Sequence, residues 1–179
     1  MVFQHLLLTG KPGTGKTSLI REAVARAEVK AGGFYTEEMR RGGIRQGFRL
    51  VTLDGREAVL AHVNFSSPYQ VSKYKVDLDS LNRVGVSAVK QALIECDLIV
   101  IDEIGKMELL SPEFREMVQR AIDSDKRVLG TIMLNPNPFC DALKAHPGVR
   151  VLTVTRENRD EVLGEMVNWL TERMGNKIG

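Results

Sequence analysis

The feature that most restricts the fold of this chain is a glycine-rich loop near its N-terminus. A nearly continuous apolar run, Val2 to Leu8, leads into Thr9, and residues 10–17 then read Gly-Lys-Pro-Gly-Thr-Gly-Lys-Thr. From Thr17 to about Lys30, apolar residues recur at helical spacing. A loop of this spacing between a strand and a helix places its backbone N–H groups and the positive helix end around phosphate oxygens. We therefore expect a polyphosphate site in which Lys16 reaches the β- and γ-phosphates and the Thr17 hydroxyl holds Mg²⁺.

Strands and helices alternate along the rest of the chain. Short apolar runs predict strands at 97–101, 127–134 and 149–154, and helical periodicity covers 80–95, 111–122 and 157–174. The second of these helices begins at Ser111-Pro112-Glu113, and Asp79 is a candidate cap for the first. Strands separated by helices predict parallel pairing through right-handed crossovers.

Residues 33–65 interrupt this alternation. Gly42-Gly43 and Asp54-Gly55 separate short apolar runs there, which predicts a strand followed by one or two hairpins. Asn135-Pro136-Asn137-Pro138 predicts a loop, and residues 66–79 carry no motif.

These patterns predict an α/β fold with a mainly parallel sheet, helices on both faces and a β-hairpin insertion around 33–65. With 179 residues, we expect one domain over 1–179. Ligands of such sheets bind beyond the carboxyl ends of the strands. Gly10, Asp102 and Leu134, which follow three of the predicted strands, should therefore converge on one site.

Two neighbouring acids end a buried strand. Leu98 to Ile101 is fully apolar, and Asp102 and Glu103 follow directly. Together with the glycine loop, an acid in this place is typical of the Mg²⁺-organising Asp of P-loop NTPases. Glu103 is placed to accept a proton from water attacking the γ-phosphorus. The alternative is that Glu103 caps a turn or pairs with Lys106.

Other polar residues leave two interpretations open. Arg40, Arg41, Arg45 and Arg49 could supply a guanidinium to the phosphates or could form a solvated turn. Lys106 could reach phosphate, and Thr131 or Asn135 could position the attacking water. Arg156, Asn158 and Arg159 could support a base or sugar, or could simply start a helix. His5, His62 and His146 show no metal-ligand spacing, and we expect structural roles for them.

Composition limits the class of protein. Hydrophobic residues make up 43% and charged residues 27%, which argues against disorder, and the net charge of +2 argues against extensive nucleic-acid contact. A local basic patch at Arg40 to Arg49 stays open. The isolated Cys96 and Cys140 indicate neither disulfides nor zinc, and the apolar runs are too short for a membrane span. We expect a cytoplasmic monomer without membrane contact.

Three segments resemble one known family. They are residues 101–108 (Ile-Asp-Glu-Ile-Gly-Lys-Met-Glu), residues 32–38 continued by Arg45 through Arg49, and Leu152 to Arg159. They look like the thermostable nucleoside-triphosphatase family, whose vertebrate member is called cancer-related nucleoside triphosphatase. The likeness covers essentially the whole chain.

The resemblance implies a Mg²⁺-dependent enzyme that removes the terminal phosphate of ATP, GTP, CTP, UTP and TTP and acts more weakly on diphosphates. It also implies a P-loop fold with an additional strand between the glycine-loop strand and the strand of Asp102, and a catalytic Glu103 beside Lys16. Metal ligands would be Thr17 and Asp102. The implied nucleotide-binding residues are Gly10, Lys11, Pro12, Gly13, Thr14, Gly15, Lys16 and Thr17 of the Walker A motif and Ile99, Val100, Ile101, Asp102, Glu103, Ile104, Gly105 and Lys106 of the Walker B segment.

Two alternative functions use the same motifs. In a nucleotide or small-molecule kinase, the 33–65 insertion would hold a phosphate acceptor. In a nucleotide-dependent switch, slow hydrolysis would time binding to RNA or protein.

Overall fold

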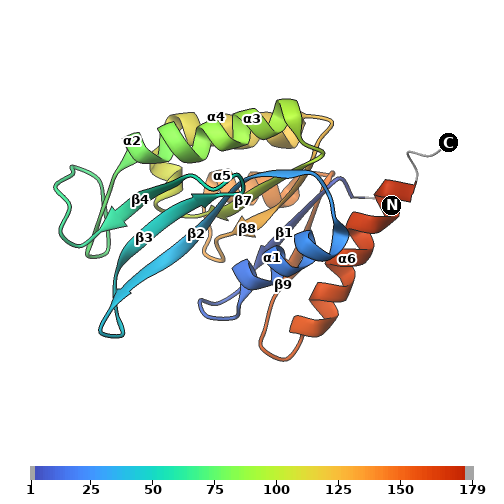
Figure 1. Ribbon diagram of the computed structural model, residues 1–179, viewed down its shortest axis with the longest axis horizontal. Helices are drawn as coiled ribbons and strands as arrows, with labels where there is room; N and C mark the ends of the chain where they lie inside the picture. Colours follow the sequence, from blue (N-terminus) through green and yellow to red (C-terminus); the bar gives the residue numbers. More distant parts are fainter. Residues whose placement is uncertain (1–2, 176–179) are drawn as a thin grey trace.

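Within residues 3–175, which the computed structural model describes, nine strands form one mixed sheet (Figure 1). Their order across the sheet is β5-β6-β4-β3-β2-β7-β8-β1-β9. The five strands from β2 to β9 in this order run parallel, and β3, β4, β6 and β5 extend the β2 edge in antiparallel pairs. The strands are β1 (His5–Thr9), β2 (Ala31–Arg41), β3 (Ile44–Thr52), β4 (Glu57–His62), β5 (Gln70–Val71), β6 (Tyr74–Val76), β7 (Leu98–Ile104), β8 (Arg127–Ile132) and β9 (Val149–Thr153).

Helices cover both faces of the sheet. One face packs against α1 and α6, whose buried residues include Ile20 and Met166, and the other packs against α3, α4 and α5. The helices are α1 (Lys16–Ala27), α2 (Leu78–Ser80), the π-helical segment η1 (Leu81–Val86), α3 (Ser87–Glu95), the 3-10 turn η2 (Glu108–Leu110), α4 (Pro112–Asp123), α5 (Pro138–Ala145) and α6 (Arg159–Gly175). None of the helices in residues 3–175 combines the length and the apolar character that a membrane crossing requires.

The predicted α/β fold is confirmed. β8 lies between β1, which leads into the glycine loop, and β7, which carries Asp102. One or two hairpins were predicted for the insertion, and two are present, because Gly42-Gly43 joins β2 to β3 and Asp54-Gly55 lies between β3 and β4. The helix predicted at Ser111 is also present, with the Ser111 hydroxyl accepting from the Phe114 N–H at its start.

Other predicted elements differ from the structure. The helical run through α2, η1 and α3 begins at Leu78, and its cap is Asp77, whose carboxylate accepts from the Ser80 N–H. Asp79, the predicted cap, lies inside the first turn and pairs with Arg83. Helix α5 was not predicted, although Asn137 caps it and Pro138 occupies its first turn. The short β5–β6 hairpin was not predicted either.

Candidate active site

The glycine loop connects β1 to α1 and turns sharply at two positions. Gly13 and Gly15 have φ of +80° and +84°, a region that costs residues with a Cβ on the order of 1 kcal/mol. The Lys16 ammonium folds back over the loop and donates to the carbonyls of Gly10 and Lys11 at 3.0 and 2.9 Å. The loop is thus closed around the Lys16 ammonium group. Burial lowers the pKa of Lys16, while the charges of Glu103 and Asp102 oppose that shift.

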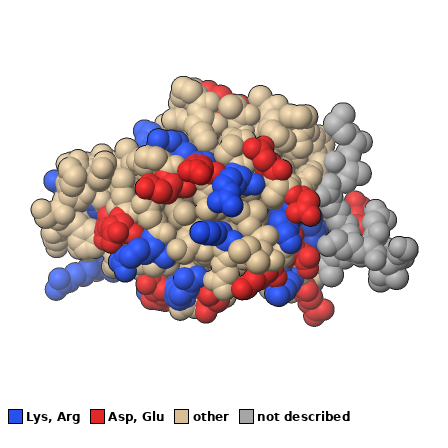
Figure 2. Space-filling model, turned by 90° about the horizontal axis from the view of Figure 1, so that it is seen from above, with Lys and Arg blue, Asp and Glu red and all other residues tan. Residues whose placement is uncertain are grey.

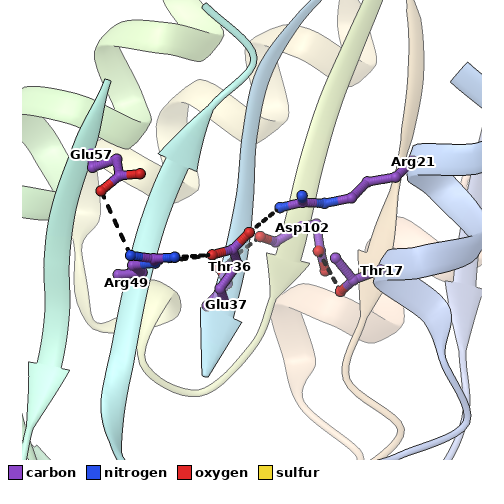
Figure 3. Close-up of polar contacts among 7 residues, drawn as sticks. All are labelled: Thr17, Arg21, Thr36, Glu37, Arg49, Glu57 and Asp102. Carbon is purple, nitrogen blue, oxygen red and sulfur yellow. Dashed lines mark hydrogen bonds and ion pairs between the residues drawn. The ribbon is translucent and has the colours of Figure 1, made fainter. Parts of the chain in front are cut away.

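Asp102 joins three strands to the glycine loop. Its Oδ2 accepts from the Thr17 hydroxyl at 2.6 Å, and the Thr36 hydroxyl donates to its backbone carbonyl at 2.7 Å (Figure 3). Its Oδ1 accepts from the Thr131 hydroxyl, also at 2.6 Å. Thr17 lies 85 residues away in sequence from Asp102. The Thr131 hydroxyl is therefore engaged with Asp102, and Asn135, the other residue considered for positioning the attacking water, lines the cavity.

Burial dominates the electrostatics of Asp102. The residue is 3% exposed, and desolvation raises the pKa of its carboxyl, while the hydrogen bonds from Thr131 and Thr17 lower it. A buried carboxylate with two hydroxyl donors gains from a nearby cation, and oxygen donors of this kind suit a hard divalent ion.

Glu103 is the next residue and lines the cavity beside the loop. Burial raises the pKa of its carboxyl, the Asp102 charge adds to this, and the Lys16 charge opposes it. The carboxyl lies over Gly105, where an added Cβ would come within 2.4 Å of Oε1. Within residues 3–175, no side chain forms a hydrogen bond or an ion pair with this carboxyl. The alternative that Glu103 pairs with Lys106 is therefore not what the structure shows.

One cavity of about 550 Å³ joins these groups. Its lining includes Gly10, Asp102 and Leu134, so the predicted convergence of three strand ends is present. Not every residue of the two predicted nucleotide-binding segments reaches it. The cavity is lined by Gly10, Pro12, Gly13, Gly15, Lys16, Thr17, Asp102, Glu103 and Lys106, whereas Ile99, Val100, Ile101 and Ile104 are completely buried in β7. Of the remaining residues, Lys11 is exposed to solvent and Thr14 is buried within the loop. Gly105 is buried directly beneath the Glu103 carboxyl.

A third acid, Glu108, also lines the cavity and had no role in the sequence prediction. It is 3% exposed, and burial raises the pKa of its carboxyl well above the ordinary value, with the charge of Glu103 as the second cause. The backbone N–H groups of Glu108 and Gly105 lower that pKa by hydrogen bonding. An acid in the run after Glu103 was visible in the sequence, but its burial depends on the fold of the loop.

Three arginines of the hairpins, Arg40, Arg45 and Arg49, are engaged in ion pairs. Arg49 lies between Glu37 and Glu57, and Glu37 also binds Arg21 of α1, which forms a chain of charges across β2, β3 and β4 (Figure 3). Arg40 and Arg45 both pair with Glu38, and of the four predicted arginines only Arg45 lines the cavity within the described residues. On the face seen in Figure 2, acidic and basic side chains are intermingled.

The residues after β9 have different positions. Asn158 accepts from the Thr155 N–H and Thr155 accepts from the Asn158 N–H, so Asn158 forms the start of α6. Arg156 is exposed. Arg159 instead lies against Gly15 of the glycine loop, and its buried Nε has no hydrogen-bond partner within residues 3–175. The three histidines contact the backbone, as expected for structural residues.

Comparisons with known proteins point to one family. The family model described as NTPase matches residues 5–167. The nucleoside-triphosphatase THEP1 of Thermotoga sp. strain RQ2 is 46% identical over 172 residues, which is 96% of this chain and 98% of that protein. The human cancer-related nucleoside-triphosphatase is 37% identical, with 92% of this chain and 95% of that protein covered.

A solved structure shows the same fold. The crystal structure of THEP1 from Aquifex aeolicus superimposes with a TM-score of 0.85 at 34% identity, covering 93% of this chain and 98% of that one. Sequence, fold and family match agree with the resemblance carried by residues 101–108, and the chain belongs to the nucleoside-triphosphatase (NTPase) family.

Proposed function

We propose that this protein hydrolyses the terminal phosphate of ATP, GTP, CTP, UTP and TTP with low base selectivity, acts more weakly on diphosphates, and requires Mg²⁺. One observation carries the proposal: the Thr17 hydroxyl of the glycine loop meets the Asp102 carboxylate at 2.6 Å, in a cavity that Lys16 and Glu103 also line. A polyphosphate in the loop would therefore lie beside both acids.

The residues present fit a magnesium ion. Thr17 and Asp102 offer oxygen donors, and Mg²⁺ in proteins is commonly held by one or two such groups together with phosphate oxygens and water. The bound ion would neutralise negative charge on the phosphates. The Thr17 hydroxyl donates a hydrogen bond to Asp102 Oδ2, so the two oxygens already lie side by side.

The protein groups have separate tasks in the proposed reaction. The loop N–H groups bind the β-phosphate region, and Lys16 moves from the Gly10 and Lys11 carbonyls to phosphate oxygens. Glu103 accepts the proton of the attacking water, since its carboxyl faces the cavity and burial makes it a stronger base. Positioning and charge stabilisation account for most of the rate in phosphoryl transfer.

Low base selectivity follows from where the binding groups lie. Loop amides, Lys16 and the Thr17–Asp102 pair would all contact phosphates and metal, which are common to every nucleoside triphosphate.

The two cysteines carry free thiols, which agrees with action in a reducing cytoplasm. We propose a monomer as the active form.

A Glu103→Gln variant tests the proposal. Phosphate release from the five triphosphates and their diphosphates is measured with and without Mg²⁺, alongside Glu116→Gln, which changes an exposed acid on α4. We expect Glu103→Gln to keep nucleotide binding while turnover falls at least about tenfold, because only the proton acceptor is lost. Unchanged turnover, or equal rates without Mg²⁺, would contradict it.

A further inference from the structure

The cavity lining includes an apolar part as well as the acids. Five side chains form this region, which we call the apolar lobe: Phe48, Leu60, Val71, Met107 and Met133. Phe48, Leu60 and Val71 come from β3, β4 and β5. In the sheet order these strands lie on the opposite side of β7 from β1, so the acids at the end of β7 stand between the glycine loop and this wall.

The apolar lobe lies on the side from which a nucleophile would reach the γ-phosphorus. The glycine loop holds the β-phosphate side, where the diphosphate leaves, and in-line displacement requires the attacking oxygen to enter from the other side. Glu103, the proposed proton acceptor, lines the cavity between the two regions. A hydroxyl carried by a molecule in the apolar lobe would therefore approach both Glu103 and the γ-phosphorus.

The lobe is more apolar than a water nucleophile needs. Its five side chains offer no hydroxyl, amide or charged group to a bound water, and they belong to segments other than the glycine loop, in a cavity whose total volume of about 550 Å³ is within the range of small-molecule sites. The wall is also ordered: the Phe48 ring packs edge-on against Tyr74 at 5.1 Å, and Arg45 lies 5.0 Å over Phe48. An aromatic body would cover this surface, while water would leave it exposed.

Charged groups of both signs line the cavity near the lobe. Arg45 is held by Glu38 and by the Tyr74 hydroxyl, each at 2.9 Å, Lys16 is assigned to the phosphates, and Lys106 is exposed to solvent. The acids Glu103 and Glu108 both line this side of the cavity and offer hydrogen-bond acceptors. An uncharged molecule with hydroxyl donors complements these acceptors better than a phosphate ester does.

We propose that the apolar lobe binds an uncharged aromatic alcohol of the nucleoside class, which accepts the terminal phosphate in place of water. The inference rests on the proposed function, since it uses the same glycine loop and Glu103. The acceptor hydroxyl oxygen forms a bond to the γ-phosphorus, the bond from that phosphorus to the β–γ bridging oxygen breaks, and the hydroxyl proton passes to Glu103. The products are a nucleoside diphosphate and a phosphate monoester of the acceptor.

The test follows label from γ-³²P-labelled GTP with Mg²⁺. Adenosine, guanosine, cytidine, uridine and thymidine are each added as acceptors, and ribose and glycerol serve as matched alcohols without an aromatic body. We expect labelled nucleoside monophosphate from at least one nucleoside, at least about tenfold above any ester of ribose or glycerol. Parallel reactions without any acceptor, in which release of labelled inorganic phosphate is measured, test the proposed hydrolysis separately. Phosphate release with no labelled nucleoside ester would overturn the acceptor site alone.

A matched pair of variants locates the acceptor. Val71→Trp fills the lobe from β5, and Gln70→Trp places the same ring at the exposed neighbour on that strand. We expect Val71→Trp to lose ester formation at least about tenfold while acceptor-free phosphate release stays within about threefold, and Gln70→Trp to change neither. If Val71→Trp instead raises KM for nucleoside triphosphates but not for inorganic tripolyphosphate, the lobe holds the substrate's own base and the acceptor proposal is wrong.

Discussion

The guanidinium of Arg159, at the start of α6, lies directly against Gly15 of the glycine loop. A Cβ added to Gly15 would come within 2.9 Å of the Arg159 Nη2 atom and 3.0 Å of its Cζ. The loop is therefore held from outside by the last helix as well as by its own turns. This contact joins the residue before α1 to the first residue of α6.

A Gly15→Ala variant separates backbone strain from this contact. We expect it to lower the free energy of unfolding by about 1–2 kcal/mol for the left-handed φ, with a smaller further loss because the Arg159 guanidinium has to shift, and to weaken nucleotide binding. Gly42→Ala is the matched control, since Gly42 also has a positive φ but nothing within 4 Å of an added Cβ. Urea unfolding of both variants, and of Gly15→Ala combined with Arg159→Ala, measures the difference. Equal losses in the two single variants would show that Arg159 imposes no constraint.

Replacing Lys16 with Ala should weaken both binding and turnover. The ammonium of Lys16 is the cation nearest to the loop interior, where it contacts the Gly10 and Lys11 carbonyls. We expect nucleotide affinity, measured by calorimetry, to fall at least about tenfold. Lys11→Ala removes the same charge from an exposed position in the same loop and should change affinity less than about threefold. Normal activity in Lys16→Ala would contradict the phosphate-loop assignment.

Thr131 should act on metal binding through Asp102. Thr131→Val leaves the buried Oδ1 of Asp102 without its hydroxyl donor, so we expect the unfolding free energy to fall by about 1–3 kcal/mol. Because Asp102 would also lose its fixed orientation, the Mg²⁺ concentration for half-maximal phosphate release should rise about threefold or more. Thr131→Ser keeps a hydroxyl and should restore most of both properties. A Mg²⁺ dependence identical in the Val variant and the unaltered protein would exclude this positioning role.

Glu108 makes stability depend on pH. Burial raises the pKa of its carboxyl in the folded chain, so the folded state binds the proton more tightly than the unfolded chain does. Its stabilising contribution is therefore complete below the ordinary value of 4.5 and is lost as the pH rises through the raised pKa. We expect Glu108→Gln to increase the unfolding free energy near about pH 7.5, by roughly 1.4 kcal/mol for each unit of the removed shift, and to lose that advantage toward pH 4.5.

Urea unfolding across this pH range, without Mg²⁺, measures the effect of Glu108→Gln. Glu116→Gln on α4 is the control for removing a negative charge, because Glu116 is exposed and should show no such pH dependence. A gain in stability that is the same at both ends of the range would indicate that the charge of Glu108 is not responsible.

Local patterns in the sequence were sufficient to predict the strands and the helix next to the glycine loop and the two acids. The spacing of glycines from Gly10 to Thr17 predicts the conformation of the glycine loop. The apolar run before Asp102 predicts a strand buried on both faces, as observed for β7. The residue pairs Gly42-Gly43 and Asp54-Gly55 likewise predict the turns of the two hairpins. In each case, the residues that determine the structure are neighbours in the chain.

What could not be predicted depends on contacts between distant segments. Strands β5 and β6 have two and three residues, and only their pairing with each other and with β4 makes them strands. The hydroxyls of Thr36 and Thr131 matter because the fold brings them to Asp102. Helix α5 is a different case, since Asn137 followed by Pro138 is a recognisable helix start that was interpreted as a loop.

The place of β8 between β1 and β7 has a consequence for how the site tolerates change. Neighbouring strands lie about 4.8 Å apart, so two backbone hydrogen-bonded steps set the distance from the loop strand to the acid strand. At Gly130 of β8 the contact with β7 is locally tighter than a residue with a Cβ allows, because an added Cβ would come within 2.2 Å of the Ile101 carbonyl oxygen. That separation is a property of the peptide backbone, so apolar side chains elsewhere in the core can be exchanged while the span available to a polyphosphate stays constant.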